Sequence, residues 1–187
     1  KMDMLREAGV FFGASITATS KSCDEVTSDE FMKMLSDKGC LWSWFFHYVP
    51  VGDSPDVSLV PNAKQRQQIL KAVYNARNTL PMMTVDFWGD GPEMMGCIAG
   101  GRQYVHVNPN GDVEPCTFVH LATHNVKNCT LTEALAAPFM KAIRDGIPYE
   151  DGHMLRPCMI VDRPDVLRKY YQEFKPYETH ENAASYL

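Results

Sequence analysis

Over the first 88 residues of the chain, short apolar runs alternate with segments that carry apolar side chains at helical spacing. Three short, apolar, β-prone runs predict strands at residues 10–17, 41–50 and 82–88. Between them, residues 27–39 and 61–79 carry apolar side chains at helical spacing, and Thr27 with Glu30 has the form of a capping box. Residues 1–9 have the pattern of the last turns of a helix that ends at Gly9. Alternating helices and strands are typical of parallel βα units.

The pattern changes at residue 89, which predicts two domains, 1–88 and 89–187. Residues 104–116 form two alternating runs joined at Asn110-Gly111, which is the strongest short-range signal for a β-hairpin. Thr130 and Glu133 form a second capping box, and we expect their helix to run to Gly146. A last helix is predicted at 164–174, followed by a loose polar tail. The expected fold class is therefore α/β followed by α+β.

The composition of the chain argues against some classes of protein. The 187 residues are 45% hydrophobic and 22% charged, which is enough to build a substantial core. The net charge of -5, without a basic run, argues against nucleic acid as a partner. The longest apolar runs are far shorter than the roughly 20 residues that span a bilayer. Because the N-terminus also lacks an apolar signal core, we expect no membrane span, a cytoplasmic location and reduced cysteines.

Six cysteines carry the main chemical signal. A disulfide framework is typical of short secreted scaffolds, so reduced thiols are favoured here. Cys97, Cys116 and Cys158 lie in irregular stretches rich in proline and glycine, and soft thiolates there suit an iron–sulfur cluster or zinc. The 18 and 41 residues between them match no compact ferredoxin or zinc-ribbon rule. Cys23 and Cys40 are most simply ordinary thiols.

Two other interpretations remain open from the residues alone. Cys116, His120 and His124 recur every fourth residue, so a helix there would place all three on one face and could hold structural zinc in a noncatalytic module. Pro115 favours extended backbone instead. Cys129 precedes a helix and is either a fourth ligand or a reactive neighbour of the cap. The other alternative is a metal-free interaction domain whose thiols only pack.

Cys97, a variable spacer and Gly111-x4-Cys116 resemble the opening pattern of the SPASM or twitch-type auxiliary-cluster domain found in radical S-adenosylmethionine (SAM) enzymes. The resemblance covers nearly the whole chain. It implies that residues 1–88 are the C-terminal half of a partial (β/α)6 barrel, with about three βα units. Residues 89–187 would be a small hairpin-plus-helices domain that binds one auxiliary 4Fe–4S cluster through Cys97, Cys116 and Cys158, for electron transfer or substrate positioning.

The same resemblance extends to cofactors and partners. Gly13-Ala-Ser15 is similar to the fourth-strand segment that contacts SAM in the family, so Ser15 is the candidate cofactor-binding residue. The family's CxxxCxxC motif does not occur in these 187 residues. The resemblance thus implies the C-terminal portion of a longer oxidoreductase, unable by itself to cleave SAM reductively and without catalytic residues of its own.

The expected partners are the missing N-terminal barrel half of the same polypeptide and an unidentified substrate, which in this family is commonly a peptide. A half-barrel exposes apolar strand surface, which predicts self-association or partial disorder of residues 1–20. Gly100-Gly101-Arg102 could present backbone donors and a cation to an anionic group, or form a plain turn.

Overall fold

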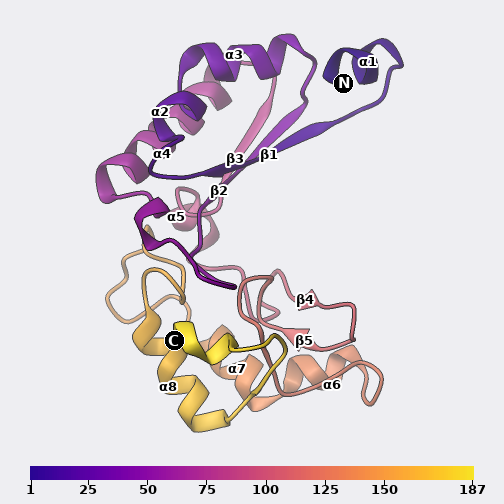
Figure 1. Cartoon of the computed structure of the whole chain (residues 1–187), viewed down its shortest axis with the longest axis vertical. Coiled ribbons are helices and arrows are strands. Elements are labelled where there is room, and N and C mark those ends of the chain that lie inside the picture. Colours follow the sequence, from indigo (N-terminus) through magenta and orange to yellow (C-terminus); the bar gives the residue numbers. More distant parts are fainter. The chain divides into compact units, whose positions relative to one another are not determined.

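The computed structural model describes residues 1–187, except for the side chain of Tyr186. The chain divides into two compact units (Figure 1). The first comprises Lys1–Pro50 and Asp56–Asp90, and the second comprises Val51–Pro55 and Gly91–Leu187. The main division thus falls two residues after the predicted boundary, and the loop 51–55 groups with the second unit.

The first unit is built around a three-stranded parallel sheet in the order β1-β2-β3. Its elements are α1 (Met2–Glu7), β1 (Gly13–Ala18), α2 (Cys23–Val26), α3 (Asp29–Asp37), β2 (Trp42–His47), the 3-10 helix η1 (Val57–Leu59), α4 (Ala63–Thr79) and β3 (Met83–Asp86). Each predicted strand overlaps an observed one, with β1 extending one residue past the predicted end, and the predicted α/β character of this region is confirmed. Parallel pairing is possible because a helical connection returns the chain to the same end of the sheet after each strand.

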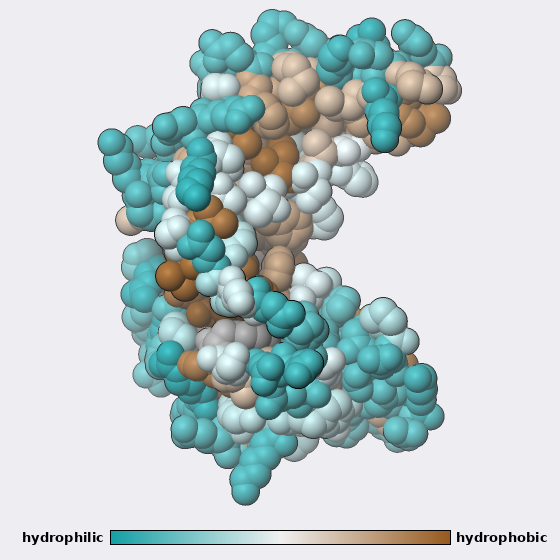
Figure 2. All heavy atoms as spheres, viewed as in Figure 1, coloured by the Kyte–Doolittle hydropathy of each residue, from teal (hydrophilic) through white to brown (hydrophobic). Residues whose placement is uncertain are grey.

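The two faces of this sheet differ. On the face covered by helices, Phe45 is fully buried and packs in one core with Ile69 and Val73 of α4. Burying such side chains stabilises the fold by about 1.5–3 kcal/mol each. On the opposite face Trp44 is 40% exposed, and its ring stacks against Phe87 with centroids 5.1 Å apart. Brown and tan hydrophobic side chains gather over this unit in Figure 2.

The N-cap of α3 differs from the one that the sequence predicts. The expected capping box at Thr27 is wrong, because the N-cap of α3 is Ser28, whose side chain accepts the backbone N–H of Phe31 at 3.1 Å. Thr27 instead donates its hydroxyl to the carbonyl of Cys23, in the short helix α2 that the sequence pattern did not predict. A hydroxyl residue can cap the following helix or close the preceding turn, and the local sequence does not decide between the two.

Buried polar groups gather near the carboxyl ends of β2 and β3. His47 stacks on Trp88 with ring centroids 4.6 Å apart, and its Nε2 lies 3.3 Å from Oδ1 of Asp86. Arg77 of α4 forms an ion pair with Asp90, whose carboxylate accepts the backbone N–H of Asp86. Among the described residues, the buried polar side-chain atoms that lack a hydrogen-bond partner belong to these two strands and to Trp88: they are in Ser43 and His47 on β2, Thr84 and Asp86 on β3, and Trp88.

The second unit contains short helices and two-residue strands. They are α5 (Gly91–Met94), β4 (His106–Val107), β5 (Val113–Glu114), β6 (Leu121–Ala122), α6 (Leu131–Ala136), α7 (Pro138–Asp145), α8 (Pro164–Phe174), β7 (Tyr177–Glu178) and η2 (Ala183–Tyr186). The predicted hairpin is confirmed as the antiparallel pair β4-β5. Its turn includes a bond from the N–H of Gly111 to the carbonyl of Asn108 at 2.9 Å, and Gly111 has a φ of 93°, which favours glycine.

Two expectations for this unit are wrong and one is confirmed in full. The helix expected to run from Thr130 to Gly146 is broken into α6 and α7, because Pro138 cannot donate a backbone hydrogen bond and starts a new helix instead. The tail after Pro176 is not loose, since β7 pairs with β6. The last helix, α8, has the predicted bounds. In the part of the chain that the structure describes, no helix is long and apolar enough to cross a membrane.

Candidate metal centre

Cys97 lies in a tight loop that is joined to the hairpin end. The loop follows α5, and the backbone N–H of Gly100 donates to the carbonyl of Pro115 at 2.9 Å, directly before Cys116. Gly100 has a φ of 69°, and a Cβ there would lie 2.5 Å from a methyl carbon of Ile143, so a larger residue would not fit. This backbone bond connects the Cys97 loop to the segment that carries Cys116.

Cys116 follows β5 in a turn that supplies donors to its sulfur. The backbone N–H groups of Phe118 and Val119 bond to the thiol, which favours its anionic form, but burial and the neighbouring Cys97 outweigh them and raise the pKa of Cys116 to about 12. Tyr104 fixes this turn from the other side, because its hydroxyl accepts the backbone N–H of Thr117 at 3.2 Å. Burial and the proximity of Cys116 raise the pKa of Tyr104 as well.

Cys158 sits in a closed turn immediately before α8. Its carbonyl accepts the N–H groups of Asp162 and Arg163 at 2.9 and 3.0 Å, and its own N–H donates to the Asp162 carboxylate at 3.2 Å. Burial raises the pKa of the Cys158 thiol, and the N–H groups of Val161 and Ile160 oppose that rise.

The structure brings the three predicted thiols together. Cys97 raises the pKa of Cys116, and both Cys97 and Cys116 raise the pKa of Cys158, after burial as the largest cause. Such coupling requires charges that lie near one another. Burial also raises the pKa of Cys97, against the N–H of Ala99 and the charge of Arg102. Each sulfur therefore has at least one backbone donor, which is the environment expected around cluster sulfurs.

The donor set can be compared with a single metal ion and with a cluster. Among the described residues, no group of three His, Cys, Asp or Glu side chains is arranged to hold one metal ion. A cluster fits better than one tetrahedral ion, because each thiolate binds a different iron atom and the sulfurs need not meet at a point. The three coupled thiols with their N–H donors fit an iron–sulfur cluster, because each thiol can bind its own iron atom.

The zinc alternative is not supported by the backbone. Residues 117–124 are turns and the short strand β6 rather than the helix that would align Cys116, His120 and His124. The rings of His120 and His180 lie tilted against each other with centroids 5.5 Å apart, whereas Nδ1 of His124 lies 3.0 Å from the Thr123 hydroxyl. The three side chains thus have separate surroundings.

Cys129 has surroundings different from those of the coupled thiols. Its Sγ lies 3.3 Å from the Asn125 carbonyl, and its charge contributes to the raised pKa of Tyr177, after burial and Asp112 as larger causes. Cys23 and Cys40 are buried in the core of the first unit, as expected of ordinary thiols.

Two neighbours of the thiols, one aromatic and one acidic, were not predicted from the sequence. Tyr149 donates its hydroxyl to the Pro157 carbonyl at 3.1 Å; burial raises the pKa of Tyr149, and Cys97 and Cys158 raise it further. Glu114 is 1% exposed although it lies two residues before Cys116. A lone tyrosine in an irregular segment gives no sequence signal, so only the fold could reveal its position.

Glu114 organises a hydrogen-bond network beneath the hairpin. Its carboxylate lies 2.6 Å from Nδ1 of His106 and accepts bonds from Asn108 and Thr179. Because Thr179 follows β7, this carboxylate connects the C-terminal strand to the hairpin that carries Cys116. A buried carboxylate needs such partners to offset the loss of its hydration. The sequence signal for Glu114 was its position in the predicted hairpin, two residues before Cys116.

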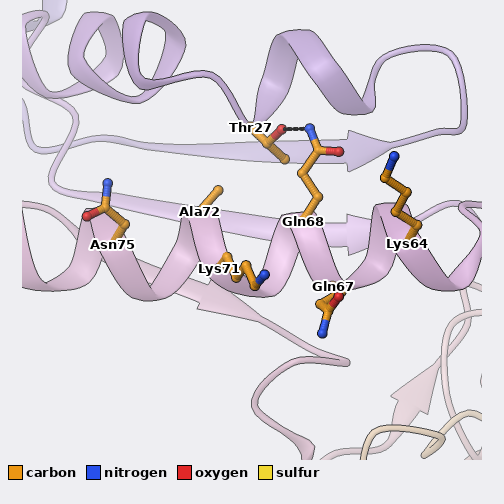
Figure 3. A pocket seen from close by; sticks show the side chains of 7 residues that line it. All are labelled: Thr27, Lys64, Gln67, Gln68, Lys71, Ala72 and Asn75. Carbon is orange, nitrogen blue, oxygen red and sulfur yellow. Dashed lines mark hydrogen bonds between the residues drawn. The ribbon is translucent and has the colours of Figure 1, made fainter.

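Ser15, the predicted SAM-binding residue, lies in the middle of β1 and pairs in register with Trp44. Both side chains are on the exposed face of the sheet. A surface depression of the first unit lies elsewhere, between α4 and the turn that ends α2 (Figure 3). Gln68 donates to Thr27 at 2.7 Å across it, and Lys64 and Lys71 complete a mainly polar lining that contains no predicted site residue.

Comparisons with known proteins agree with this geometry. Residues 97–160 match the SPASM family, described as an iron-sulfur cluster-binding domain. The fold is similar to a solved structure described as native anSMEcpe with bound AdoMet, with a TM-score of 0.58 and 13% sequence identity. That match covers 91% of this chain but 56% of the solved one, so this chain spans just over half of its length. A search of curated proteins gave no match.

These findings confirm the predicted resemblance to radical SAM enzymes with a SPASM domain. Residues 97–160 carry the SPASM match, and the first of the coupled thiols, Cys97, is its first residue. All three coupled thiols lie within the matched range. The mixed α/β fold with its parallel sheet resembles a radical SAM enzyme of known structure.

Proposed function

We propose that the second unit is an auxiliary-cluster module that binds one 4Fe–4S cluster through Cys97, Cys116 and Cys158. The proposal is carried by the place of these three cysteines in turns of one compact unit, where backbone N–H groups bond to each sulfur and Cys97 raises the pKa of both other thiols. Thiolates select iron–sulfur clusters, and hydrogen bonds to the sulfurs tune the reduction potential. The SPASM match over 97–160 supports the same conclusion.

The residues of this chain have defined tasks in such a module. The turns after Cys116 and Cys158 direct backbone N–H groups at the sulfurs, and the loop at 97–104 keeps Cys97 beside the hairpin. Tyr149 and Tyr104 lie near the thiols, since Cys97 and Cys158 contribute to the raised pKa of Tyr149 and Cys116 to that of Tyr104, after burial as the largest cause. When bound, a cluster of this kind supplies one-electron transfer or an iron that can position substrate. Three cysteines leave one iron for another ligand.

We propose that the first unit is half of a radical SAM barrel in a longer oxidoreductase. In this proposal the exposed face of β1, β2 and β3 lines the barrel interior, and Ser15 contacts SAM there. The similar solved structure holds AdoMet, which supports the proposal. The partner of this face is then the other barrel half of the same polypeptide. A cytoplasmic location suits reduced thiols.

Anaerobic reconstitution tests the cluster proposal. The purified chain is incubated with ferrous iron, sulfide and a thiol reductant, desalted, and analysed for iron, sulfide and visible absorbance, with a parallel incubation in zinc. We expect a brown protein with about four iron and four sulfide per chain. A colourless protein that takes up one zinc and no iron would instead support the structural zinc alternative on Cys116, His120 and His124.

Light scattering tests the proposed partner surface. Val10 and Phe11 are 49% and 86% exposed before β1, and with the exposed sheet face they would be covered in a complete barrel. We expect the isolated chain to self-associate, and Phe11→Ser to reduce the mean mass. A monomer at all concentrations would argue against an uncovered barrel half.

A further inference from the structure

The side chain of Arg102 holds the loop that carries Cys97. Its Nη1 donates to the Cys97 carbonyl at 2.7 Å and lies 3.5 Å from the Gly96 carbonyl, while Nη2 donates to the Met94 carbonyl. Arginine suits this task because its planar fork presents several donors in fixed directions. The guanidinium thus faces the backbone carbonyl groups of Met94, Gly96 and Cys97, rather than an anionic ligand in solvent.

The same contact places a permanent charge next to a thiol. The guanidinium is bonded to the carbonyl of Cys97 itself, so a permanent positive charge lies beside the residue that carries the sulfur. Its charge favours the anionic form of Cys97, whereas Asp162 acts in the opposite direction. At Cys116 and Cys158 the main groups that favour the anion are backbone N–H donors.

We propose that Arg102 is a positioning residue of the cluster site, which fixes the Cys97 loop and makes reduction of the cluster easier through its charge. This inference rests on the proposed function. Reduction adds one negative charge to a cluster, so a nearby fixed cation stabilises the reduced form more than the oxidised form and raises the reduction potential.

A merely structural role would produce a different result, and the chain offers a matched control. Arg144 of α7 also supports this loop, with Nη1 donating to the Gly100 carbonyl at 2.9 Å. The carbonyl that accepts this bond belongs to Gly100, three residues after Cys97. If the arginines act only as braces, replacing either should affect loop stability alone. If charge beside Cys97 matters, only Arg102 should change the potential.

The test compares Arg102→Gln, Arg102→Lys and Arg144→Gln in the reconstituted full chain, by redox titration with electron paramagnetic resonance detection. We expect Arg102→Gln to lower the ratio of reduced to oxidised cluster about tenfold at a fixed potential, a shift of about 59 mV to more negative values. Arg102→Lys should keep the wild-type potential but retain less iron after desalting, because it loses the fork. Arg144→Gln should keep the wild-type potential.

Equal shifts in Arg102→Gln and Arg144→Gln, or no shift in either, would overturn the role of Arg102. If Arg102→Gln retains no cluster, Arg102→Lys decides the matter, because a wild-type potential supports the charge role and a shifted one overturns it. A wild-type chain that binds no iron refutes the proposed function itself, whereas the other outcomes leave that function intact.

Discussion

The two units are built by different means. The first is a parallel sheet whose strands and helices follow from hydrophobic periodicity, with Phe45 and Ile69 fully buried in its core. The second has strands of two residues, and loops place its thiols. The regular unit presents broad faces, whereas the loop-rich unit brings distant side chains together. The difference shows that chemistry here depends on turn geometry more than on regular structure.

The largest expected effect concerns the loop-rich unit. Cys116→Ser should abolish cluster binding, because it removes the thiol that couples to both other thiols. Cys129→Ser is the control, since the Cys129 sulfur bonds to the Asn125 carbonyl, and it should retain wild-type iron. Iron analysis after anaerobic reconstitution measures both. Equal iron in the two variants would remove the distinction between these cysteines.

A second expected effect is on the pH dependence of assembly. Burial raises the pKa of Cys116 to about 12, so its thiolate fraction below that pH rises tenfold per pH unit. Because ligand thiols must lose their protons, iron loading should accelerate as the pH rises from about 6.5 to 8.5, by at most tenfold per unit. Stopped-flow absorbance at limiting iron measures the rate. A rate that falls over this range would contradict the assigned thiol protonation.

The core of the regular unit should be sensitive to truncation without loss of iron. Phe45→Ala should destabilise the first unit by about 3–5 kcal/mol, whereas Trp44→Ala on the exposed face of the same strand should cost much less. Urea unfolding followed by circular dichroism measures both. If the units fold independently, iron content in Phe45→Ala stays near wild type. Loss of iron in parallel with loss of structure would show that the second unit depends on the first.

A smaller effect is expected at the capping box of α6. Thr130 accepts the N–H of Glu133 at 3.2 Å, and Glu133 accepts the N–H of Thr130 in return. Thr130→Ala should cost the second unit about 1 kcal/mol, whereas Thr130→Ser should retain most of the stability. Thermal unfolding of the metal-free chain distinguishes them. Indistinguishable midpoints for the alanine and serine variants would show that the box contributes little.

The smallest effect is expected for a buried hydroxyl of the first unit. Thr84 is fully buried, and its Oγ1 is among the described polar atoms without a hydrogen-bond partner. Thr84→Val should therefore leave the free energy of unfolding unchanged or raise it slightly. Ser43→Ala on the neighbouring strand removes another such hydroxyl, and it should also leave the free energy of unfolding nearly unchanged. A cost above about 1 kcal/mol would indicate that the hydroxyl has a partner in solution.

The sequence predicted regular elements better than connections. The strands, α4, the hairpin and α8 follow from periodicity and capping residues, which act over a few positions. The break between α6 and α7 could have been predicted from Pro138, because proline is common at the first position of a helix. The pairing of β7 with β6 was not readable, because it joins residues over 50 positions apart through two-residue strands.

The candidate site shows the same limit. The setting of Cys97, Cys116 and Cys158 in irregular segments, and the Gly111-x4-Cys116 spacing, are the local signals on which the predicted ligand set rests. The positions of Tyr149, Glu114 and Arg102 depend on how loops fold back on one another, which no spacing rule describes. The local sequence of Cys129 also suits a ligand, and only the fold shows that its sulfur bonds to the Asn125 carbonyl.

Iron anomalous diffraction from crystals of the anaerobically reconstituted chain tests the central claim most directly. The account predicts one compact anomalous peak, bordered by the sulfur atoms of Cys97, Cys116 and Cys158. A peak at Cys129 or at His120 and His124, or a reconstituted chain whose three sulfurs border no iron, would contradict it.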